Sequence, residues 1–399
     1  MYITPVIPAS GSIVLSNNII KKAEELVINS AKLTGGHNIQ FINALKDLLR
    51  ITNSYYSNMI ESEGTHPLDI EKAMKKEFFE DEKKKDLQML SLIHIDIQKY
   101  LESQEPTEDK KVYSLNTILD IHKEFYSKEE MNYALNIKYN DLEVNMIPGK
   151  LRTSDVSVGS HIAPSSDELE AYFNEFETLY NHSNNYSKTM RLIYAFCSHH
   201  RLVYIHPFYD GNGRISRLYL DYLFKMIDIE GYGLWNISRG LARNQDKYKQ
   251  ALAFADEPYK GSYDDDRGKL TLKGLNKFLE FILDVALDQV DYMSELIRID
   301  TISTKITNYV EFSQKNMYHN IAPLPKHSEK IFQTLLVQGE IARNSIKDII
   351  NVSKPTAIKI VKELEQRNYI YSDAPKSPIK LKLNSHFASE IIPGLIPKV

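Results

Sequence analysis

A glycine-rich turn followed directly by an apolar helical stretch is the feature that most constrains the fold of this chain. Gly211-Asn212-Gly213 can adopt positive φ values, and successive backbone N–H groups in such a turn form a cradle for anions. Residues 215–224 are typical of a helix, so the turn is expected at a helix N-terminus. Unpaired N–H groups and the helix dipole favour phosphate there. The sequence therefore predicts a phosphate-binding turn at the start of a helix.

The side chains around this turn suit the handling of a polyphosphate. Arg214 and Arg217 lie three residues apart on one helical face, so their guanidiniums can clamp successive phosphates. Asp210 precedes the turn and is placed to hold Mg²⁺, which binds nucleotides through one or two carboxylates and phosphate oxygens. Histidine has a reference pKa near neutrality, which makes His206 the natural general base for a hydroxyl. The alternative, a core histidine beside solvated arginines, does not explain why these residue types occur together within twelve residues.

Residues 206–217 resemble the signature of the Fic family, His-x-Phe-x-(Asp/Glu)-Gly-Asn-Gly-Arg-x-x-Arg, and fill every specified position. The resemblance implies an all-α fold, a Fic-type helical bundle with a small β-hairpin flap. It also implies a protein adenylyltransferase, which moves AMP from ATP to a Ser, Thr or Tyr hydroxyl of a target protein and requires Mg²⁺. The nucleotide would be bound by Asp210, Gly211, Asn212, Gly213, Arg214 and Arg217, with His206 as the base, Asp210 as the metal ligand and Phe208 as the anchor of the loop.

A helix indicated by Ile39, Ile42, Leu45, Leu48 and Leu49 runs into a second short motif. Ser57 and Glu61 match the (Ser/Thr)-x-x-x-Glu-(Gly/Asn) pattern of the inhibitory helix that precedes the Fic core in part of the family. Ser62 stands where Gly or Asn is expected. The resemblance implies that Glu61 pairs with Arg217 and withholds it from the terminal phosphate of ATP. The simpler alternative is a solvated glutamate at a helix end.

Two further regions are assigned to the nucleotide by the resemblance. Residues 145–163 contain a Pro148-Gly149 turn signal and alternating apolar residues, which predict short strands. They resemble the Fic flap, whose open edge binds the main chain of the protein target, and the nucleotide contacts would come from Val156, Ser157, Val158 and Gly159. A helix expected over residues 238–255 carries Tyr248, placed against the adenine, while Asp256 stands where Asn is frequent. An ordinary surface hairpin and a packing tyrosine are the alternatives.

The chain divides into four expected segments. These are an N-terminal helical region (1–105) with the inhibitory helix near 54–62, the catalytic core (106–300), a linker (301–327) that contains Pro323 and Pro325, and a winged helix-turn-helix domain (328–399). The last segment carries 11 Lys+Arg against 7 Asp+Glu. Its expected recognition helix, residues 354–367, is rich in lysine, so contact with DNA or with a protein is expected there.

Composition limits the remaining classes of function. The net charge of −4 argues against nucleic-acid binding by the whole chain, and Cys197, the single cysteine, excludes an intrachain disulfide. No apolar run is long enough for a membrane span, and the N-terminus lacks a signal-peptide pattern, so a cytoplasmic protein without membrane contact is expected. His199 and His200 are adjacent on a helix and face different sides, which disfavours a metal cluster with His206. A second copy of the chain, forming a homodimer, remains a candidate partner.

Two other activities are compatible with the motifs, and a third is disfavoured by them. A Fic protein can remove AMP from modified targets, in which case Glu61 would position a water molecule. A nucleotide-sensing DNA-binding regulator would bind ATP without turnover. A phosphotransferase is disfavoured, because such members of the family have a lysine near the second glycine and lack the distal arginine, whereas Gly213, Arg214 and Arg217 are all present.

Overall fold

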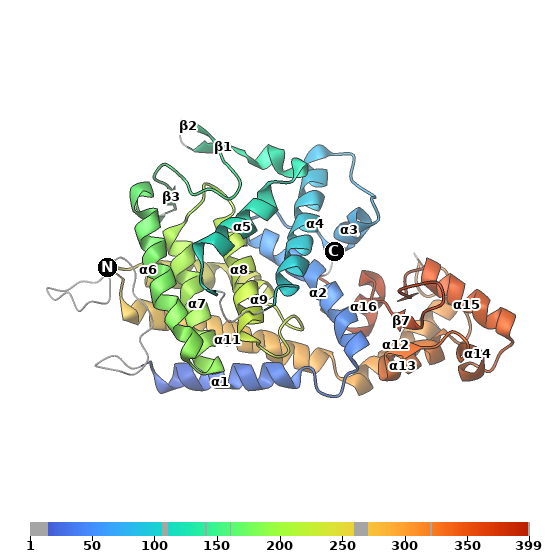
Figure 1. Cartoon of the computed structure of the whole chain (residues 1–399). Coiled ribbons are helices and arrows are strands. Elements are labelled where there is room, and N and C mark those ends of the chain that lie inside the picture. The colour runs from blue at the N-terminus through green and yellow to red at the C-terminus, as the bar shows by residue number, and fades with distance from the viewer. Residues whose placement is uncertain are drawn as a thin grey trace.

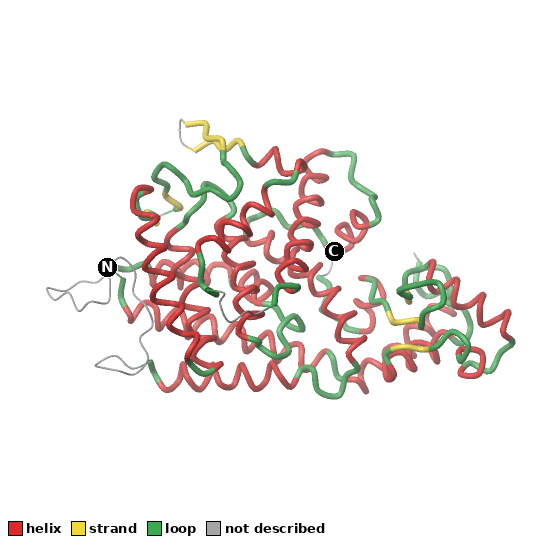
Figure 2. Tube along the Cα trace, in the orientation of Figure 1, coloured by secondary structure: helices red, strands yellow, loops and turns green. Residues whose placement is uncertain are grey.

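The computed structural model describes residues 15–105, 111–139, 142–159, 161–258, 270–319 and 321–397. The first 14 residues, whose sequence lacks a signal-peptide pattern, lie outside the described residues. Within them the fold is predominantly helical, with short strands (Figures 1 and 2). No described helix is both long and apolar enough to cross a membrane.

The N-terminal region consists of α1 (Asn17–Lys32), α2 (Ile39–Ile60), α3 (Pro67–Met74) and α4 (Glu82–Glu102). Side chains cap all four of these helices: Ser16, Asn38, His66 and Asp81 each accept a hydrogen bond from a backbone N–H in the first turn. α2 packs against α4 and α9 (Ile237–Arg243). The predicted helix that carries Ser57 is therefore a real element, and it is buried between the N-terminal region and the core.

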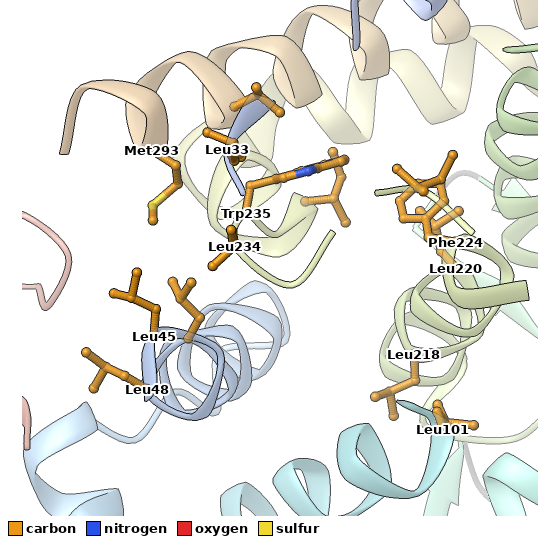
Figure 3. Close-up of a cluster of buried hydrophobic side chains, with 14 of the residues drawn as sticks. Leu33, Leu45, Leu48, Leu101, Leu218, Leu220, Phe224, Leu234, Trp235 and Met293 are labelled. Atoms are coloured by element: carbon orange, nitrogen blue, oxygen red, sulfur yellow. The ribbon is translucent and has the colours of Figure 1, made fainter. Parts of the chain in front are cut away.

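The core is built around the antiparallel pair α7 (Lys188–Ile205) and α8 (Asn212–Ile227), with α8 near the centre of the bundle in Figure 1. Around this pair lie α5 (Leu115–Tyr126), α6 (Leu169–Asn181), α10 (Gln245–Ala255) and α11 (Leu272–Leu296). Figure 3 shows part of the buried core, with Leu45 and Leu48 from α2, Phe224 from α8, and Trp235 from the segment before α9. The Trp235 indole N–H donates to Ser30 Oγ at 2.8 Å, which joins this segment to α1.

One helix expected over residues 238–255 is interrupted. α9 ends at Arg243 and α10 begins at Gln245, with Asn244 between them at φ −122° and ψ 34°, outside the helical region. The Asn244 side chain donates to Gly240 O at 2.9 Å and thereby satisfies a carbonyl at the end of α9. An asparagine that competes with the backbone for hydrogen bonds accounts for the break.

Two small antiparallel hairpins precede α6. The first, β1 (Asn136–Tyr139) with β2 (Leu142–Asn145), was not anticipated and follows the 3₁₀ helix Glu129–Ala134. The second, β3 (Ser157–Val158) with β4 (His161–Ile162), pairs Ser157 with Ile162 and Val158 with His161. The short strands expected within residues 145–163 are therefore present, as the second hairpin.

The C-terminal region begins earlier than the linker prediction implies. α12 (Ile299–Gln314) covers much of the stretch assigned to a linker, because Ile302, Ile306, Tyr309 and Val310 recur at helical spacing and are buried. Among the described residues between Gln314 and Ser328, which include Pro323 and Pro325, none belongs to a helix or strand. The first half of the predicted linker is thus helical.

Beyond this stretch the elements are α13 (Ser328–Gln338), β5 (Glu340–Ile341), α14 (Ile346–Ile349), α15 (Lys354–Gln366), β6 (Ile370–Tyr371), β7 (Ile379–Leu381) and α16 (Ser385–Ile391). The strands form one antiparallel sheet in the order β5-β7-β6. Three helices with a hairpin after the third follow the order expected of a winged helix-turn-helix, and α16 is an addition to it. α16 also packs against α3, which brings this region to the N-terminal helices.

Candidate active site

The site lies on the loop between α7 and α8, and the backbone of this loop is tightly fixed. His206 ends α7 at φ 50°, and Gly211 precedes α8 at φ 80°, both in the left-handed region. A Cβ on Gly211 would lie 2.4 Å from the Tyr126 hydroxyl oxygen, so only glycine fits there. The Asn212 side chain accepts from the Phe208 N–H at 2.9 Å and donates to the Phe208 carbonyl at 2.8 Å. Asn212 therefore ties the loop closed, and the turn leads into a helix N-terminus as the sequence predicted.

Phe208 anchors this loop in the core. Its ring stacks on His122 with the ring centroids 3.8 Å apart, and the side chain is buried. Arg152, also buried, donates from Nε to the His206 carbonyl at 2.9 Å, and its backbone N–H donates to the Pro207 carbonyl at 2.9 Å. Arg152, in the segment that precedes β3, thus holds the main-chain carbonyls of His206 and of the residue after it.

His206 lies where a neutral imidazole is favoured. Burial lowers the pKa of His206 to about 4, and the nearby charges of His161 and Arg152 act in the same direction. At neutral pH the ring is therefore unprotonated, which is the form that can accept a proton from a hydroxyl.

Glu61 and Arg217 form the ion pair that the sequence predicted. Arg217 Nη2 lies 2.8 Å from Glu61 Oε1, and the same guanidinium donates to Ser57 through Nε–H···Oγ at 3.0 Å and Nη2–H···O=C at 2.8 Å. A Cβ on Gly213 would lie 2.1 Å from Glu61 Oε1. The Glu61 carboxylate therefore rests directly on the glycine turn as well as on the arginine.

The other arginine of the motif has an acidic partner that the sequence reasoning missed. Arg214 pairs through Nη1 with Glu63, and its Nη2 donates to Tyr126 OH and to Asp210 Oδ2, both at 3.0 Å. The available signal was an acidic residue two positions after Glu61. A pairing across about 150 positions of sequence cannot be read from that spacing alone.

Ser62 shows why Gly or Asn is expected at its position. Its φ is 64°, and it is the left-handed residue that ends α2. The Ser62 N–H donates to Met59 O at 3.0 Å and the Glu63 N–H to Asn58 O at 2.9 Å, the two bonds of a Schellman turn. Serine therefore keeps the helix end that the motif implies, at the cost of a conformation that glycine adopts more readily.

A cavity of about 910 Å³ opens beside His206, between hairpin β3–β4 and α10. Val158 and Gly159 line it, together with His161, Ile162, His206 and Asp256. Of the four expected flap contacts, Val158 and Gly159 line the cavity, whereas the buried Val156 and the exposed Ser157 do not. The hairpin therefore covers a space large enough for a nucleoside.

Tyr248 does not line this cavity. The side chain is only 4% exposed, and its hydroxyl lies 2.9 Å from His199 Nε2 and close to Arg217. Its ring is stacked in the core between His199 and Phe281. The structure thus places Tyr248 close to Arg217 in the core, where packing rather than contact with the adenine accounts for it.

Asp256 connects the hairpin to the core. Its Oδ2 lies 3.2 Å from His161 Nδ1 on β4, and its Oδ1 lies 3.0 Å from His200 Nε2 on α7. Burial raises the pKa of Asp256, but the hydrogen bonds from both imidazoles outweigh it and hold the pKa well below its usual range. Among the described residues, no group of three or more His, Cys, Asp or Glu side chains is arranged to hold a metal ion.

Comparison with known proteins gives matches to the same family. Residues 112–224 match the model of the Fic/DOC family. Curated relatives named "Protein adenylyltransferase Fic" are 43% identical over 79 residues in Aedes aegypti and 42% identical over 76 residues in Drosophila melanogaster. These alignments cover 19% of this chain and 15% of each relative, so the chain matches only a small part of them.

Two solved structures share the fold. A Fic family protein from Desulfovibrio desulfuricans G20 aligns over 94% of this chain and 99% of its own, with a TM-score of 0.51 and 15% identity. Fic-1 (aa134–508) from C. elegans aligns over 70% of this chain and 72% of its own, with a TM-score of 0.50 and 14% identity.

The bundle places the glycine turn at the start of α8, beside a buried neutral histidine. Residues 112–224 match the Fic/DOC family model, and the chain shares its fold with a solved Fic family protein. The all-α fold predicted from the signature is confirmed.

Proposed function

We propose that this protein is an adenylyltransferase that modifies protein hydroxyls and is held inactive by Glu61. The observation that carries the proposal is the position of the Glu61 carboxylate, which lies both on Arg217 and against Gly213. A carboxylate there occupies the place that an anionic phosphate would take in a cradle of this kind. The neutral His206 beside it supports acid–base chemistry on a hydroxyl rather than binding alone.

The proposed reaction uses the side chains of this turn. The oxygen of the target hydroxyl forms a bond to the α-phosphorus of ATP while His206 takes the hydroxyl proton. The bond between the α-phosphorus and the oxygen that bridges to the β-phosphate breaks, and pyrophosphate leaves. Arg214 and Arg217 hold the β- and γ-phosphates once their carboxylate partners have left. Catalysis then depends on in-line placement and charge neutralisation.

Mg²⁺ fits this arrangement at Asp210. The Asp210 side chain is 43% exposed at the entrance of the turn, so one carboxylate is accessible and phosphate oxygens would complete the coordination. The ion would supply charge neutralisation on the phosphates.

The protein substrate is proposed to dock on hairpin β3–β4. Among the residues that the structure describes, its two strands pair only with each other, so main-chain groups at an outer edge remain for a third strand. Val158 and Ile162 are 51% and 79% exposed, which offers apolar contacts next to the cavity.

Labelled ATP tests the proposed reaction. Incubation of the Glu61→Gly variant with Mg²⁺ and ATP labelled in the α-phosphate is expected to label protein, whereas ATP labelled in the γ-phosphate is expected to leave it unlabelled. Transfer of the γ-label would indicate phosphotransfer instead. Loss of a pre-installed AMP from a target, without any labelling, would favour AMP removal. Binding of ATP with neither outcome would indicate a nucleotide sensor.

A second proposal concerns α15, which we infer contacts double-stranded DNA. Lys354, Lys359 and Lys362 are exposed on this helix, and exposed Ile358 lies among them. Replacing the three lysines by alanine is expected to weaken binding to a 30-base-pair duplex. The affinity is also expected to depend less on salt. The slope of log affinity against log salt concentration becomes shallower by about 0.9 for each phosphate that the variant no longer neutralises. Fluorescence anisotropy at several salt concentrations measures both effects.

The exposed lysines Lys83, Lys84 and Lys85 on α4 provide a matched triple-alanine control for this experiment. This control variant also removes three positive charges from the chain, but from α4, which lies outside the C-terminal region. An equal loss of affinity in both triple variants would argue against a site on α15.

A further inference from the structure

A second carboxylate from the end of α2 holds the other arginine of the motif. Glu63 pairs with Arg214 as Glu61 pairs with Arg217, and Arg214 is almost completely buried. We propose that Glu63 is a second inhibitory residue, which must leave Arg214 before this arginine can bind a phosphate of the nucleotide. The inference rests on the proposed function, since it concerns the regulation of the same site.

The hydrogen bonds of Arg214 show what Glu63 withholds. Nη2 already donates to Tyr126 and Asp210, and the buried Nε has no hydrogen-bond partner among the described residues. Nη1 is therefore the terminal nitrogen that an incoming anion would use, and Glu63 occupies it. Because a charge-assisted pair competes directly with a phosphate for the same donor, Glu63 is expected to weaken nucleotide binding.

Glu61 and Glu63 are both carried by the same turn at the end of α2. Glu61 is the C-cap of α2, Ser62 reverses the chain in the left-handed region, and the Glu63 N–H returns to Asn58 O. The Gln245 side chain also donates to Ile60 O at 2.7 Å, which fixes this end against α10. A displacement of the α2 end would therefore withdraw both carboxylates together, whereas a single substitution withdraws one.

The local charge gives the direction of the effect. Three carboxylates, those of Glu61, Glu63 and Asp210, face the two guanidiniums of the motif. With Glu61 removed, carboxylates and guanidiniums are equal in number. With Glu63 removed as well, Asp210 alone opposes two positive charges, so a polyphosphate meets net positive charge only in the double variant. The Glu61→Gly variant is thus expected to be only partly released.

Binding and turnover measured side by side test this inference. The wild type, Glu63→Ala, Glu61→Gly and the double variant are titrated calorimetrically with α,β-methylene-ATP and Mg²⁺, and each is assayed for labelling by ATP labelled in the α-phosphate. The double variant is expected to bind the analogue about threefold to tenfold more tightly than Glu61→Gly. Glu63→Ala alone is expected to change little, because Arg217 remains paired. Glu80→Ala, which removes an exposed carboxylate before α4, is the matched control.

The outcomes separate the two proposals. Equal affinity of the double variant and Glu61→Gly would overturn the role of Glu63, whatever the labelling shows. Tighter binding by the double variant without labelling of any protein would support the role of Glu63 and reject the transferase reaction. Tighter binding by Glu80→Ala as well would mean that net charge, not contact with Arg214, is responsible, and would also overturn it. Thermal melts of all variants check that each is folded.

Discussion

Replacing Glu61 by glycine is expected to raise the rate of protein adenylylation about tenfold to a hundredfold. The variant removes the ion pair that holds Arg217, and it also clears the space above Gly213 that the carboxylate occupies. The freed guanidinium keeps its bonds to Ser57, so it remains oriented for a phosphate. Incorporation of label from ATP labelled in the α-phosphate, followed over time with Mg²⁺ present, measures the change.

A matched variant distinguishes the charge of Glu61 from its bulk. Glu61→Gln keeps the shape of the side chain over the glycine turn but removes the charge that pairs with Arg217. If the charge dominates, Glu61→Gln is activated nearly as much as Glu61→Gly. If occupancy of the turn dominates, it stays close to the wild type. An unchanged rate in both variants would show that Glu61 is not the inhibitory residue.

The parts of the fold that the sequence predicted well are those fixed by local chemistry. The helix of residues 39–60 has apolar residues at helical spacing and an asparagine cap, although its end at Ile60, followed by the left-handed Ser62, was seen only in the structure. The glycine turn is similar, because a positive φ at Gly211 and a helix start at Asn212 are both encoded within a few residues. Such features depend little on the rest of the chain.

Other parts depend on partners that are distant in sequence. The first half of the expected linker is helical because the apolar residues of α12 pack against α13 and α16, partners that the linker sequence does not reveal. The resemblance assigned Tyr248 to the adenine, yet its hydroxyl lies 2.9 Å from His199 Nε2 and its side chain is buried. The contacts of Glu63 with Arg214 and of His161 with Asp256 likewise join segments that only the tertiary fold brings together.

Removal of the imidazole at residue 206 is expected to lower the labelling rate about a hundredfold to ten-thousandfold. The comparison is made in the Glu61→Gly background, where the rate is high enough to measure the loss. Affinity for α,β-methylene-ATP is expected to stay within about twofold, because the phosphates are assigned to the glycine turn and the arginines rather than to the imidazole.

The backbone at this position decides which substitution is informative. His206 has a φ of 50°, and the left-handed region is costly for alanine but is tolerated by asparagine. His206→Asn therefore removes the base while preserving the turn, whereas His206→Ala also adds strain. If both variants lose activity equally and keep their affinity for the analogue, the loss is chemical. If His206→Asn retains the rate of its parent, the assignment of His206 as the base is wrong.

The pH dependence provides an independent check on the same residue. The pKa of His206 is lowered to about 4 by burial, with the charges of His161 and Arg152 adding to the effect. The neutral ring is the active form, so kcat/KM of the Glu61→Gly variant is expected to be flat from neutral pH down to about pH 5 and to fall as the pH passes through about 4. Since the folded-state pKa lies below the ordinary value, protonation at low pH also opposes burial of the ring and destabilises the fold there. Rates measured only at pH values where the melting temperature is unchanged isolate the catalytic effect. A fall of kcat/KM centred near pH 6.5 would mean that the imidazole is not buried as the structure places it.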